Sequence, residues 1–309
     1  MQRLSALAKK RTPFLFYTDF KAQHTEVFTL DELEKEDIEF SFNTHHSKEH
    51  SHFLTKYPID FTSYEKAFNA IIEKIKAGET YLLNYTCQTP VQIPLSLKEI
   101  YSIANAPFKL RVKDDFVCFS PERFIKIENN TISTYPMKGT IDASIDNAQA
   151  KILANAKEMA EHIMVVDLLR NDLSMVSQEV RVSKFRYIDK IKAGKKELLQ
   201  VSSEIQGKLE ENWRENLGDI LQTLLPAGSI TGTPKKRTVE IINEIETGKR
   251  NHFTGVFGIF DGENFDSAVM IRFIESSKEG LVYKSGGGIT LESKAKDEYQ
   301  EMIDKIYIP

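Results

Sequence analysis

FVCFSPERFIKIENNTISTYPMKGT, residues 116–140, is the stretch that most clearly indicates the fold, because it predicts an antiparallel β-hairpin. Two strand-like runs flank Asn129-Asn130, a pair that tolerates the positive φ angles of a tight turn. In the register set by a two-residue loop, Glu122 faces Met137. We therefore expect a carboxylate and Lys138 to end within one residue of each other at the open end of the hairpin.

The direction of the Lys138 side chain is open at this point. Pro136 and Gly139 flank it and bend the strand. Spacing alone favours a solvent-exposed Glu/Lys pair, and a functional acid and amine are the alternative.

Composition indicates a protein that works in the cytoplasm. The 309 residues include 45 acidic and 41 basic side chains, a net charge of −4, and 41% are hydrophobic. This balance argues against a nucleic-acid binder and against a polybasic membrane-surface protein. Cys87 and Cys118 are too few for a disulfide scaffold, and we expect them to be buried fillers. The start of the chain is too short in apolar residues for a signal peptide, and no run is long enough to span a membrane.

Hydrophobic spacing predicts a mixed α+β fold. Helical periodicity covers 61–76 and stops at Gly78, and it recurs over 147–169, from Thr233-Pro234 onward and over 293–307. Strand-like runs lie at 14–20, 38–42, 80–93, 197–209, 253–261, 266–275 and 281–285. Because no repeat or linker interrupts the pattern, we expect one large domain rather than two.

Two of the predicted helices carry an acidic pair at i, i+3 spacing. The pairs are Glu158/Glu161 and Glu298/Glu301. Residues three apart share a helix face, so two such helices could place four carboxylates around one hard cation such as Mg²⁺. A di-iron bundle would need Glu-x-x-His, and Met159 stands three residues before His162. For any single pair, a solvated helix face is the better interpretation.

Three loops have both a functional and an ordinary interpretation. LLPAGSITGTPKKR (224–237) is a small-residue loop feeding a helix N-terminus, which suits an anion or an ordinary capped helix start; its spacing is not that of a Walker A loop. SGGGITLES (285–293) allows close backbone approach to a carboxylate or a tight turn. NTHHSKEHSH (43–52) is favoured as a polar loop over a metal site. No arrangement for nucleophilic catalysis by Ser or Cys stands out.

Seven motifs in this order resemble those of the chorismate-utilising enzymes, most closely the short form of aminodeoxychorismate synthase component I. They are SPERF (120–124), PMKGT (136–140), AEHIMVVDLLRNDL (160–173), GSITGTPK (228–235), IRF (271–273), GGGI (286–289) and EYQEMIDK (298–305). The resemblance implies a single chorismate-binding catalytic domain over 1–309, in which a shortened N-terminal part (1–60) precedes the motif-bearing core (61–309). It also implies a layered antiparallel β-sandwich framed by helices, with the site between the layers.

The resemblance assigns roles to the motif residues. It implies that the four glutamates hold Mg²⁺, with Glu161 and Glu301 as the more direct ligands. The enolpyruvyl carboxylate of chorismate would be held by Arg272, Lys305, Gly286 and Gly288, and the ring carboxylate by Gly139, Thr140 and Ser229. A guanidinium suits the first task because it binds a carboxylate through two parallel hydrogen bonds.

The expected reaction is amination of chorismate to 4-amino-4-deoxychorismate, for p-aminobenzoate and folate synthesis. By resemblance, Lys138 is the nucleophile that attacks C2 while the C4 hydroxyl leaves, and Glu122 protonates that hydroxyl. The amine must then be neutral, which requires a pKa below the ordinary value of about 10.4. The chain shows no amidotransferase triad, so a separate glutamine amidotransferase subunit is expected to supply ammonia.

Other functions stay open. Anthranilate synthase component I is one alternative, although its members carry a small residue at the place of Lys138. Leu82 stands where isochorismate synthases carry a water-activating lysine, which opposes water as the nucleophile. Gln200 replaces a histidine and Phe253 a substrate-contacting tyrosine of the relatives, and no segment of the tryptophan-binding type is found. A non-catalytic chorismate-binding homologue is the remaining alternative.

Overall fold

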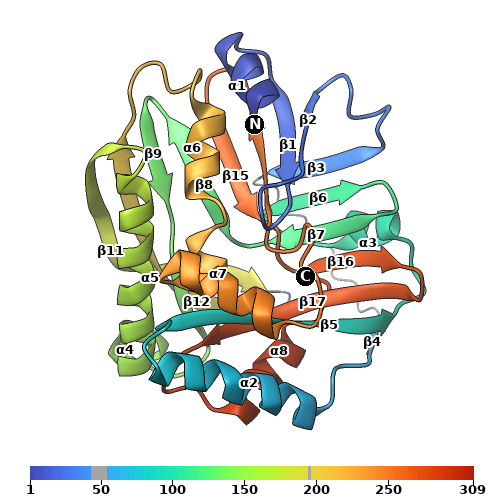
Figure 1. Cartoon of the computed structure of the whole chain (residues 1–309), viewed down its shortest axis with the longest axis vertical. Coiled ribbons are helices and arrows are strands. Elements are labelled where there is room, and N and C mark those ends of the chain that lie inside the picture. Colours follow the sequence, from blue (N-terminus) through green and yellow to red (C-terminus); the bar gives the residue numbers. More distant parts are fainter. Residues whose placement is uncertain (43–53, 194–195) are drawn as a thin grey trace.

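A computed structural model describes residues 1–42, 54–193 and 196–309 (Figure 1). In these ranges the helices are α1 (Gln2–Lys9), α2 (Phe61–Lys76), α3 (Leu97–Ile103), α4 (Ala148–Ala154), α5 (Ala156–Ser174), α6 (Leu217–Leu224), the 3₁₀ turn η1 (Gly228–Ile230), α7 (Lys235–Ile245) and α8 (Ala295–Asp304). None of these helices has both the length and the apolar character needed to cross a membrane. The predicted histidine-rich loop 43–52 lies outside the described residues.

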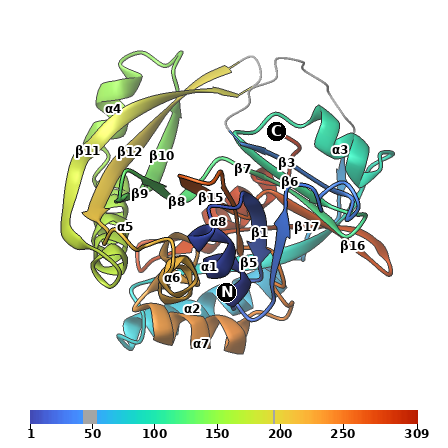
Figure 2. The same cartoon turned by 90° about the horizontal axis from the view of Figure 1, so that it is seen from above.

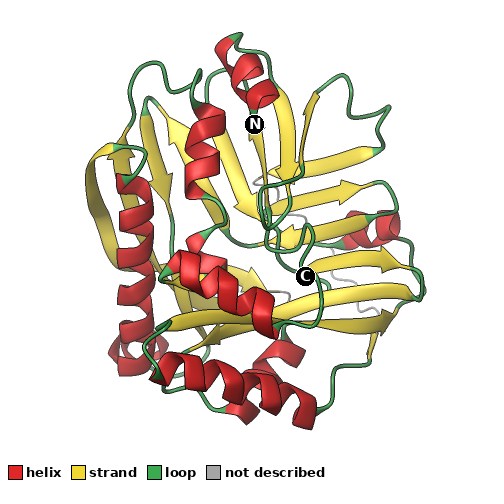
Figure 3. Cartoon of the chain, in the orientation of Figure 1, coloured by secondary structure: helices red, strands yellow, loops and turns green. Residues whose placement is uncertain are grey.

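The strands form two antiparallel sheets (Figure 3). In the first, the order is β10 (Met137–Asp142), β12 (Lys196–Lys208), β9 (Thr131–Thr134), β8 (Arg123–Glu128), β15 (Phe265–Val269), β14 (Val256–Phe260), β1 (Phe14–Thr18), β2 (Thr25–Thr29), and β11 (Gln178–Ala193) pairs with β12. In the second, the order is β13 (Gly232–Thr233), β5 (Leu82–Gln92), β17 (Gly280–Ile289), β16 (Phe273–Ser277), β7 (Phe116–Ser120), β6 (Phe108–Val112), β3 (Ile38–Phe42), and β4 (Thr55–Lys56) pairs with β5. The predicted α+β class with antiparallel layers and framing helices is confirmed.

Two groups of helices pack against different strands of the two sheets. In Figures 1 and 2, α4 and α5 lie against β10, β11 and β12, whereas α2, α7 and α8 lie along β5 and β17. The main core joins both groups: apolar residues of α2, α5, α6 and α7 pack with β5, β14 and β15 in one buried cluster. Cys87 and Cys118 are buried and free, as expected.

The 61–76 helix prediction is confirmed at both ends. Asp60 caps α2 by accepting a hydrogen bond from Ser63 N at 2.9 Å. The apolar stripe of α2 is buried. The chain leaves the helix at Gly78, whose φ of +73° lies in the left-handed region that favours glycine.

The structure refines three predicted helices, of which the last, expected over 293–307, is α8 (Ala295–Asp304). The 147–169 segment is two helices, because Asn155 leaves helical geometry and its side chain accepts from Glu158 N at 3.1 Å, which starts α5 afresh. At the later helix, Thr233 belongs to β13 and pairs with Leu82, so Pro234 rather than Thr233 is the residue before α7.

The hairpin prediction is confirmed at its turn and wrong at its open end. Asn129 and Asn130 have φ of +48° and +60°, and Glu128 pairs with Thr131 as expected. The pairing of β8 and β9 ends near Thr134, however, and the next strand, β10, pairs with β12 instead. Glu122 therefore does not pair with Met137, and any approach to Lys138 depends on the tertiary structure.

Candidate active site

Lys138 projects from a bulge in β10. The register of β10 against β12 shifts between Met137 and Thr140, and Gly139 inside the bulge has φ of +80°. The amine of Lys138 lies 3.3 Å from Glu161 Oε2 of α5. A Cβ placed on Gly288 of β17 would lie 3.5 Å from the same nitrogen. The bulge thus brings the amine between an acidic helix and the glycine-rich strand.

Glu122 lies in surroundings that favour its protonated form. Its carboxyl accepts a hydrogen bond from Ser229 Oγ. Burial raises the pKa of this carboxyl above its ordinary value, and the hydrogen bond and the charges of nearby cations offset only part of that effect. The cations that act on it are Lys138, Arg272 and Lys305. A carboxylic acid in this state can donate a proton.

Ser229 is held by residues that the sequence analysis did not single out. It lies in η1, and its carbonyl oxygen accepts a hydrogen bond from Asn84 Nδ2 of β5 at 3.1 Å. The neighbouring Gly228 lies against Asp172 of α5, and Asp172 forms an ion pair with Lys235 at 2.7 Å. Asp172 and Lys235 belong to the motifs at 160–173 and 228–235, and this membership was the sequence signal that could have identified them.

Lys305 approaches the glycine-rich strand from the end of α8. Its amine donates to the carbonyl oxygen of Gly286 at 2.9 Å and lies 2.6 Å from Glu301 Oε1. A Cβ on Gly287 would lie 3.3 Å from Glu301 Oε1 and 3.6 Å from Glu298 Oε2. Gly287, which was not among the predicted residues, therefore faces the acidic pair of α8.

The four predicted metal ligands lie near this strand and bulge, in two pairs. Glu158 Oε2 lies beside Gly139, where a Cβ would come within 3.2 Å of it, and Glu161 contacts Lys138. Glu298 is buried and accepts from Ser293 Oγ at 2.7 Å. Among the described residues, no three His, Cys, Asp or Glu side chains are close enough to hold one metal ion. The oxygen-only donor set suits Mg²⁺, and convergence on one ion stays a prediction.

Arg272 has the free hydrogen-bonding capacity that a carboxylate site needs. Its backbone φ is +52°, and its guanidinium lies 5.4 Å from the ring centre of Tyr307. Its Nε is buried and has no hydrogen-bond partner. An unpartnered buried donor is costly unless a ligand or water satisfies it, which fits the predicted role of Arg272.

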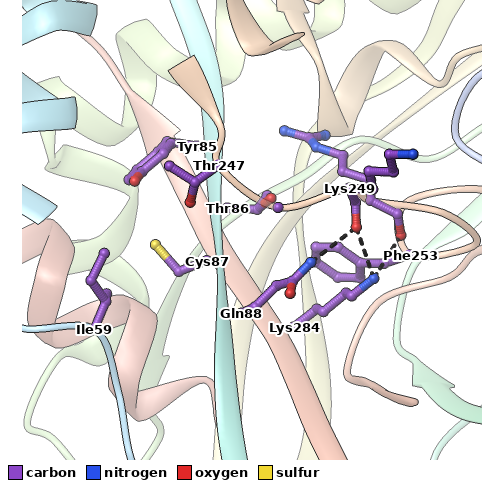
Figure 4. Close-up of a pocket in the computed structure, with 11 residues that line it drawn as sticks. Ile59, Tyr85, Thr86, Cys87, Gln88, Thr247, Lys249, Phe253 and Lys284 are labelled. Atoms are coloured by element: carbon purple, nitrogen blue, oxygen red, sulfur yellow. Dashed lines mark hydrogen bonds between the residues drawn. The ribbon is translucent and has the colours of Figure 1, made fainter. Parts of the chain in front are cut away.

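The two departures from the relatives lie in different surroundings. Gln200 of β12 pairs with Thr140 in the bulged strand, and its Oε1 is buried without a hydrogen-bond partner. Phe253 is buried 5.9 Å from the ring of Phe273 and lines a pocket of about 150 Å³ beside β5 and β17. Gln88 and Lys284 close this pocket by donating to the carbonyl oxygen of Lys249 (Figure 4). None of the predicted site residues lines it.

A buried histidine joins α5 to the sheet beside Lys138. His162 Nε2 and Ser203 Oγ of β12 are 2.7 Å apart, and neither side chain is exposed. Burial lowers the pKa of this imidazole to about 4, with smaller contributions from Arg186 and Lys138, so the ring is neutral at pH 7. No functional role was predicted for His162, which belongs to the motif at 160–173 and whose spacing to Met159 excluded a di-iron site.

The two-sheet fold is that of the solved chorismate-utilising enzymes. Residues 4–309 match the family described as chorismate binding enzyme, and the chain belongs to that family of enzymes acting on chorismate.

Known relatives and structures agree with this membership. An uncharacterised PabA-like protein of Haemophilus influenzae is 46% identical over 100% of this chain and 96% of its own length. Aminodeoxychorismate synthase component 1 of Bacillus subtilis is 33% identical over 79% of this chain, which spans 54% of that protein. The structure of anthranilate synthase component I from Streptococcus pneumoniae is 26% identical, with a TM-score of 0.69 over 83% of this chain and 59% of its own. The menaquinone-specific isochorismate synthase MenF of Escherichia coli, 15% identical, shares the fold at a TM-score of 0.72 over 97% of this chain and 78% of its own.

Proposed function

We propose that this protein converts chorismate and ammonia to 4-amino-4-deoxychorismate, as an aminodeoxychorismate synthase component 1. The observation that carries the proposal is the pair of Lys138 and Glu122. The amine of Lys138 lies beside Gly288, near the acidic cluster formed by Glu158, Glu161, Glu298 and Glu301. Burial raises the pKa of the Glu122 carboxyl. A nucleophile and a proton donor are the two groups that this displacement needs. The pathway served would be p-aminobenzoate and folate synthesis, in the cytoplasm.

The proposed reaction uses each acid twice. The neutral amine of Lys138 forms a bond to C2, the ring double bond shifts, and the C4 hydroxyl leaves as water with the proton of Glu122. Glu161 Oε2, 3.3 Å from Lys138, is placed to accept the proton that the amine loses. Ammonia then forms the bond at C4 while the bond between C2 and Lys138 breaks. The departing amine takes back the proton held by Glu161, and the new C4 ammonium gives a proton to the Glu122 carboxylate, so both acids return to their starting states. The neutral state of Lys138 stays a prediction.

The remaining residues would bind the substrate and a cation. Arg272 and Lys305, with the backbone of Gly286 and Gly288, would hold the enolpyruvyl carboxylate. Gly139, Thr140 and Ser229 would contact the ring carboxylate. Mg²⁺ would be held by Glu158, Glu161, Glu298 and Glu301, where it would neutralise the dianionic substrate. The ammonia would come from a glutamine amidotransferase subunit on a separate chain.

The alternatives have less support from the site. Leu82 is buried and lies against Gly288, so that position offers no base to activate water. Anthranilate synthesis has no use for an amine at Lys138. A binding-only homologue would not need a carboxyl held in the protonated form. These alternatives give different products, which makes them separable in one assay.

The test is to incubate the protein with chorismate, Mg²⁺ and ammonium, and to identify the product by mass spectrometry. We expect 4-amino-4-deoxychorismate, and we expect Lys138→Ala to lower the rate by about 10³-fold or more and to abolish any covalent adduct. Lys126→Ala is the matched control, because Lys126 lies in β8 of the same sheet, is about as exposed as Lys138 (29% against 25%) and is also paired with a glutamate, Glu128. Anthranilate or isochorismate as the main product, or no product, would refute the proposal. An adduct on another lysine would refute the role of Lys138.

A further inference from the structure

The distance between Lys138 and Glu161 depends on how two separate elements are held together. Lys138 lies in the β10 bulge, and Glu161 lies in α5. Their 3.3 Å contact is partly exposed, with 25% of the Lys138 side chain accessible, so it is not rigid by itself. A more buried contact must therefore hold the bulge in its position relative to α5.

Ser203 of β12 contacts α5 and the residue that precedes β10. Its N–H donates to the carbonyl oxygen of Pro136, two residues before Lys138, at 3.0 Å. Its hydroxyl lies 2.7 Å from Nε2 of His162, the residue that follows Glu161. The N–H of Arg186 in β11 donates to the same hydroxyl at 2.9 Å. One fully buried serine therefore joins α5, β11 and the start of the strand that carries the bulge.

Ser203 Oγ accepts a hydrogen bond from the N–H of Arg186. A serine hydroxyl has one proton and two acceptor sites, so Ser203 donates to His162 Nε2 or accepts from it according to the tautomer of the imidazole. The other ring nitrogen, Nδ1, is buried and has no hydrogen-bond partner. In either tautomer the bond to Ser203 is the polar contact that orients this ring, and the ring centroids of His162 and Phe185 are 6.0 Å apart.

We propose that His162 and Ser203 are positioning residues that fix Lys138 relative to Glu161. They form a buried link between α5 and the bulge. The proposal rests on the proposed function, in which Lys138 is the nucleophile. Neither residue takes part in bond making; each acts through the placement of Lys138. Loss of the link frees the bulge from α5 and lets the amine move away from Glu161.

The first test measures the placement of Lys138 without substrate. The protein is treated with N-hydroxysuccinimidyl acetate, and acetylation of each lysine is followed by peptide mass spectrometry. Lys305, 28% exposed and also paired with a glutamate, is the internal reference. We expect Ser203→Ala to change the ratio of the Lys138 and Lys305 rates by about fivefold or more, since amine reactivity follows its surroundings.

The matched control is Ser267→Ala. Ser267 is as fully buried as Ser203, and its hydroxyl also bridges two strands, donating to the carbonyl oxygen of Ile125 at 2.8 Å. It makes no contact with Lys138 or α5 among the hydrogen bonds of the described residues. An equal change of the labelling ratio in both variants would show general loosening and overturn the proposal, as would no change in Ser203→Ala.

The second test uses kinetics and conservative rescue. We expect Ser203→Ala and His162→Phe to lower kcat for aminodeoxychorismate formation by about 10- to 100-fold with KM for chorismate within about twofold. His162→Gln places an acceptor near Nε2, and Ser203→Thr keeps the hydroxyl; both should recover most of the loss if they fold. Full activity in His162→Phe would overturn the proposal. If the parent protein makes no aminodeoxychorismate, the proposed function fails, and the labelling ratios still decide whether the link positions Lys138.

Discussion

At the scale of single residues, the site separates an acid from an amine by their surroundings. Glu122 is enclosed and accepts from Ser229 Oγ, and burial raises its pKa. Lys138 lies 3.3 Å from Glu161 at a more open position. Groups whose environments differ in this way can take opposite roles in proton transfer at one pH.

The raised pKa of Glu122 predicts a pH dependence of stability. The native state binds this proton more tightly than the unfolded state, whose carboxyl has a pKa near 4.5. The stability that Glu122 contributes is therefore full below about pH 4.5 and is lost as the pH rises through the native pKa. Glu122→Gln keeps the acceptor for Ser229 but cannot ionise. We expect its unfolding free energy to fall less between pH 4.5 and pH 8 than that of the parent, as measured by urea denaturation.

The same variant separates stability from catalysis. Loss of the proton donor should lower the rate of aminodeoxychorismate formation by about 10²- to 10⁴-fold, although the fold is retained. A Glu122→Gln protein that keeps more than a tenth of the activity would show that the proton comes from elsewhere. Equal pH dependence of stability in the two proteins would contradict the effect of burial on Glu122.

At the scale of elements, β17 brings neighbouring glycines to different tasks. A Cβ on Gly286 would lie 2.1 Å from the carbonyl oxygen of Tyr85 in the paired strand β5. This clash is with a backbone atom, so it can be relieved only by moving one strand away from the other. The three atoms nearest to a Cβ on Gly287 would be the side-chain ends of Glu301, Lys305 and Glu298, the nearest at 3.3 Å. The first glycine is needed for strand pairing, and the second leaves room for the acidic cluster.

This difference predicts opposite outcomes for two alanine substitutions. Gly286→Ala should destabilise the protein by about 2 kcal/mol or more, because the β5–β17 pairing must shift. Gly287→Ala should fold with stability within about 1 kcal/mol of the parent, but should raise the Mg²⁺ concentration needed for half-maximal activity by about fivefold or more. Chemical denaturation and Mg²⁺ titration of the initial rate measure the two effects. An unchanged Mg²⁺ titration in Gly287→Ala would remove this strand from the proposed metal site.

At the scale of the whole molecule, the described residues among the first 60 contribute strands to both sheets. β1 pairs with β14 and β2 in the first sheet, and all five of its residues are buried. β3 pairs with β6 at the far end of the second sheet. These strands belong to the same layers as the strands after residue 60, and the division at that residue stays a prediction.

The placement of β1 predicts that residues 61–309 do not fold alone. Removal of residues 1–60 would expose the edge of β14 that pairs with β1. It would also remove the packing of Phe14 against Phe260, whose ring centroids are 5.4 Å apart. We expect the truncated chain to lack a cooperative thermal transition and to aggregate, as followed by circular dichroism and size-exclusion chromatography. A monodisperse truncated protein with a sharp transition would show that the core is independent of its N-terminal part.

Local patterns determined the mixed α+β class and most of the elements. The 61–76 helix and the Asn129-Asn130 turn follow from apolar spacing and backbone preference, which act between near neighbours in the chain. The break at Asn155 was missed because a capping side chain can outweigh continuous apolar periodicity. Motif resemblance named Lys138, Glu122 and the acidic pairs without showing how they lie.

Only the tertiary structure decided which of these residues meet. The two-residue-loop register paired Glu122 with Met137, but β10 pairs with β12 rather than with β8, so Lys138 acts on Glu122 from a bulge in a strand outside that hairpin. The role of Gly287, the Asn84–Ser229 contact and the Ser203–His162 link have no local signature, because each joins segments more than 40 residues apart or depends on packing between elements. Long-range contacts of this kind arise from the packing of strands and helices, which neighbouring residues do not specify.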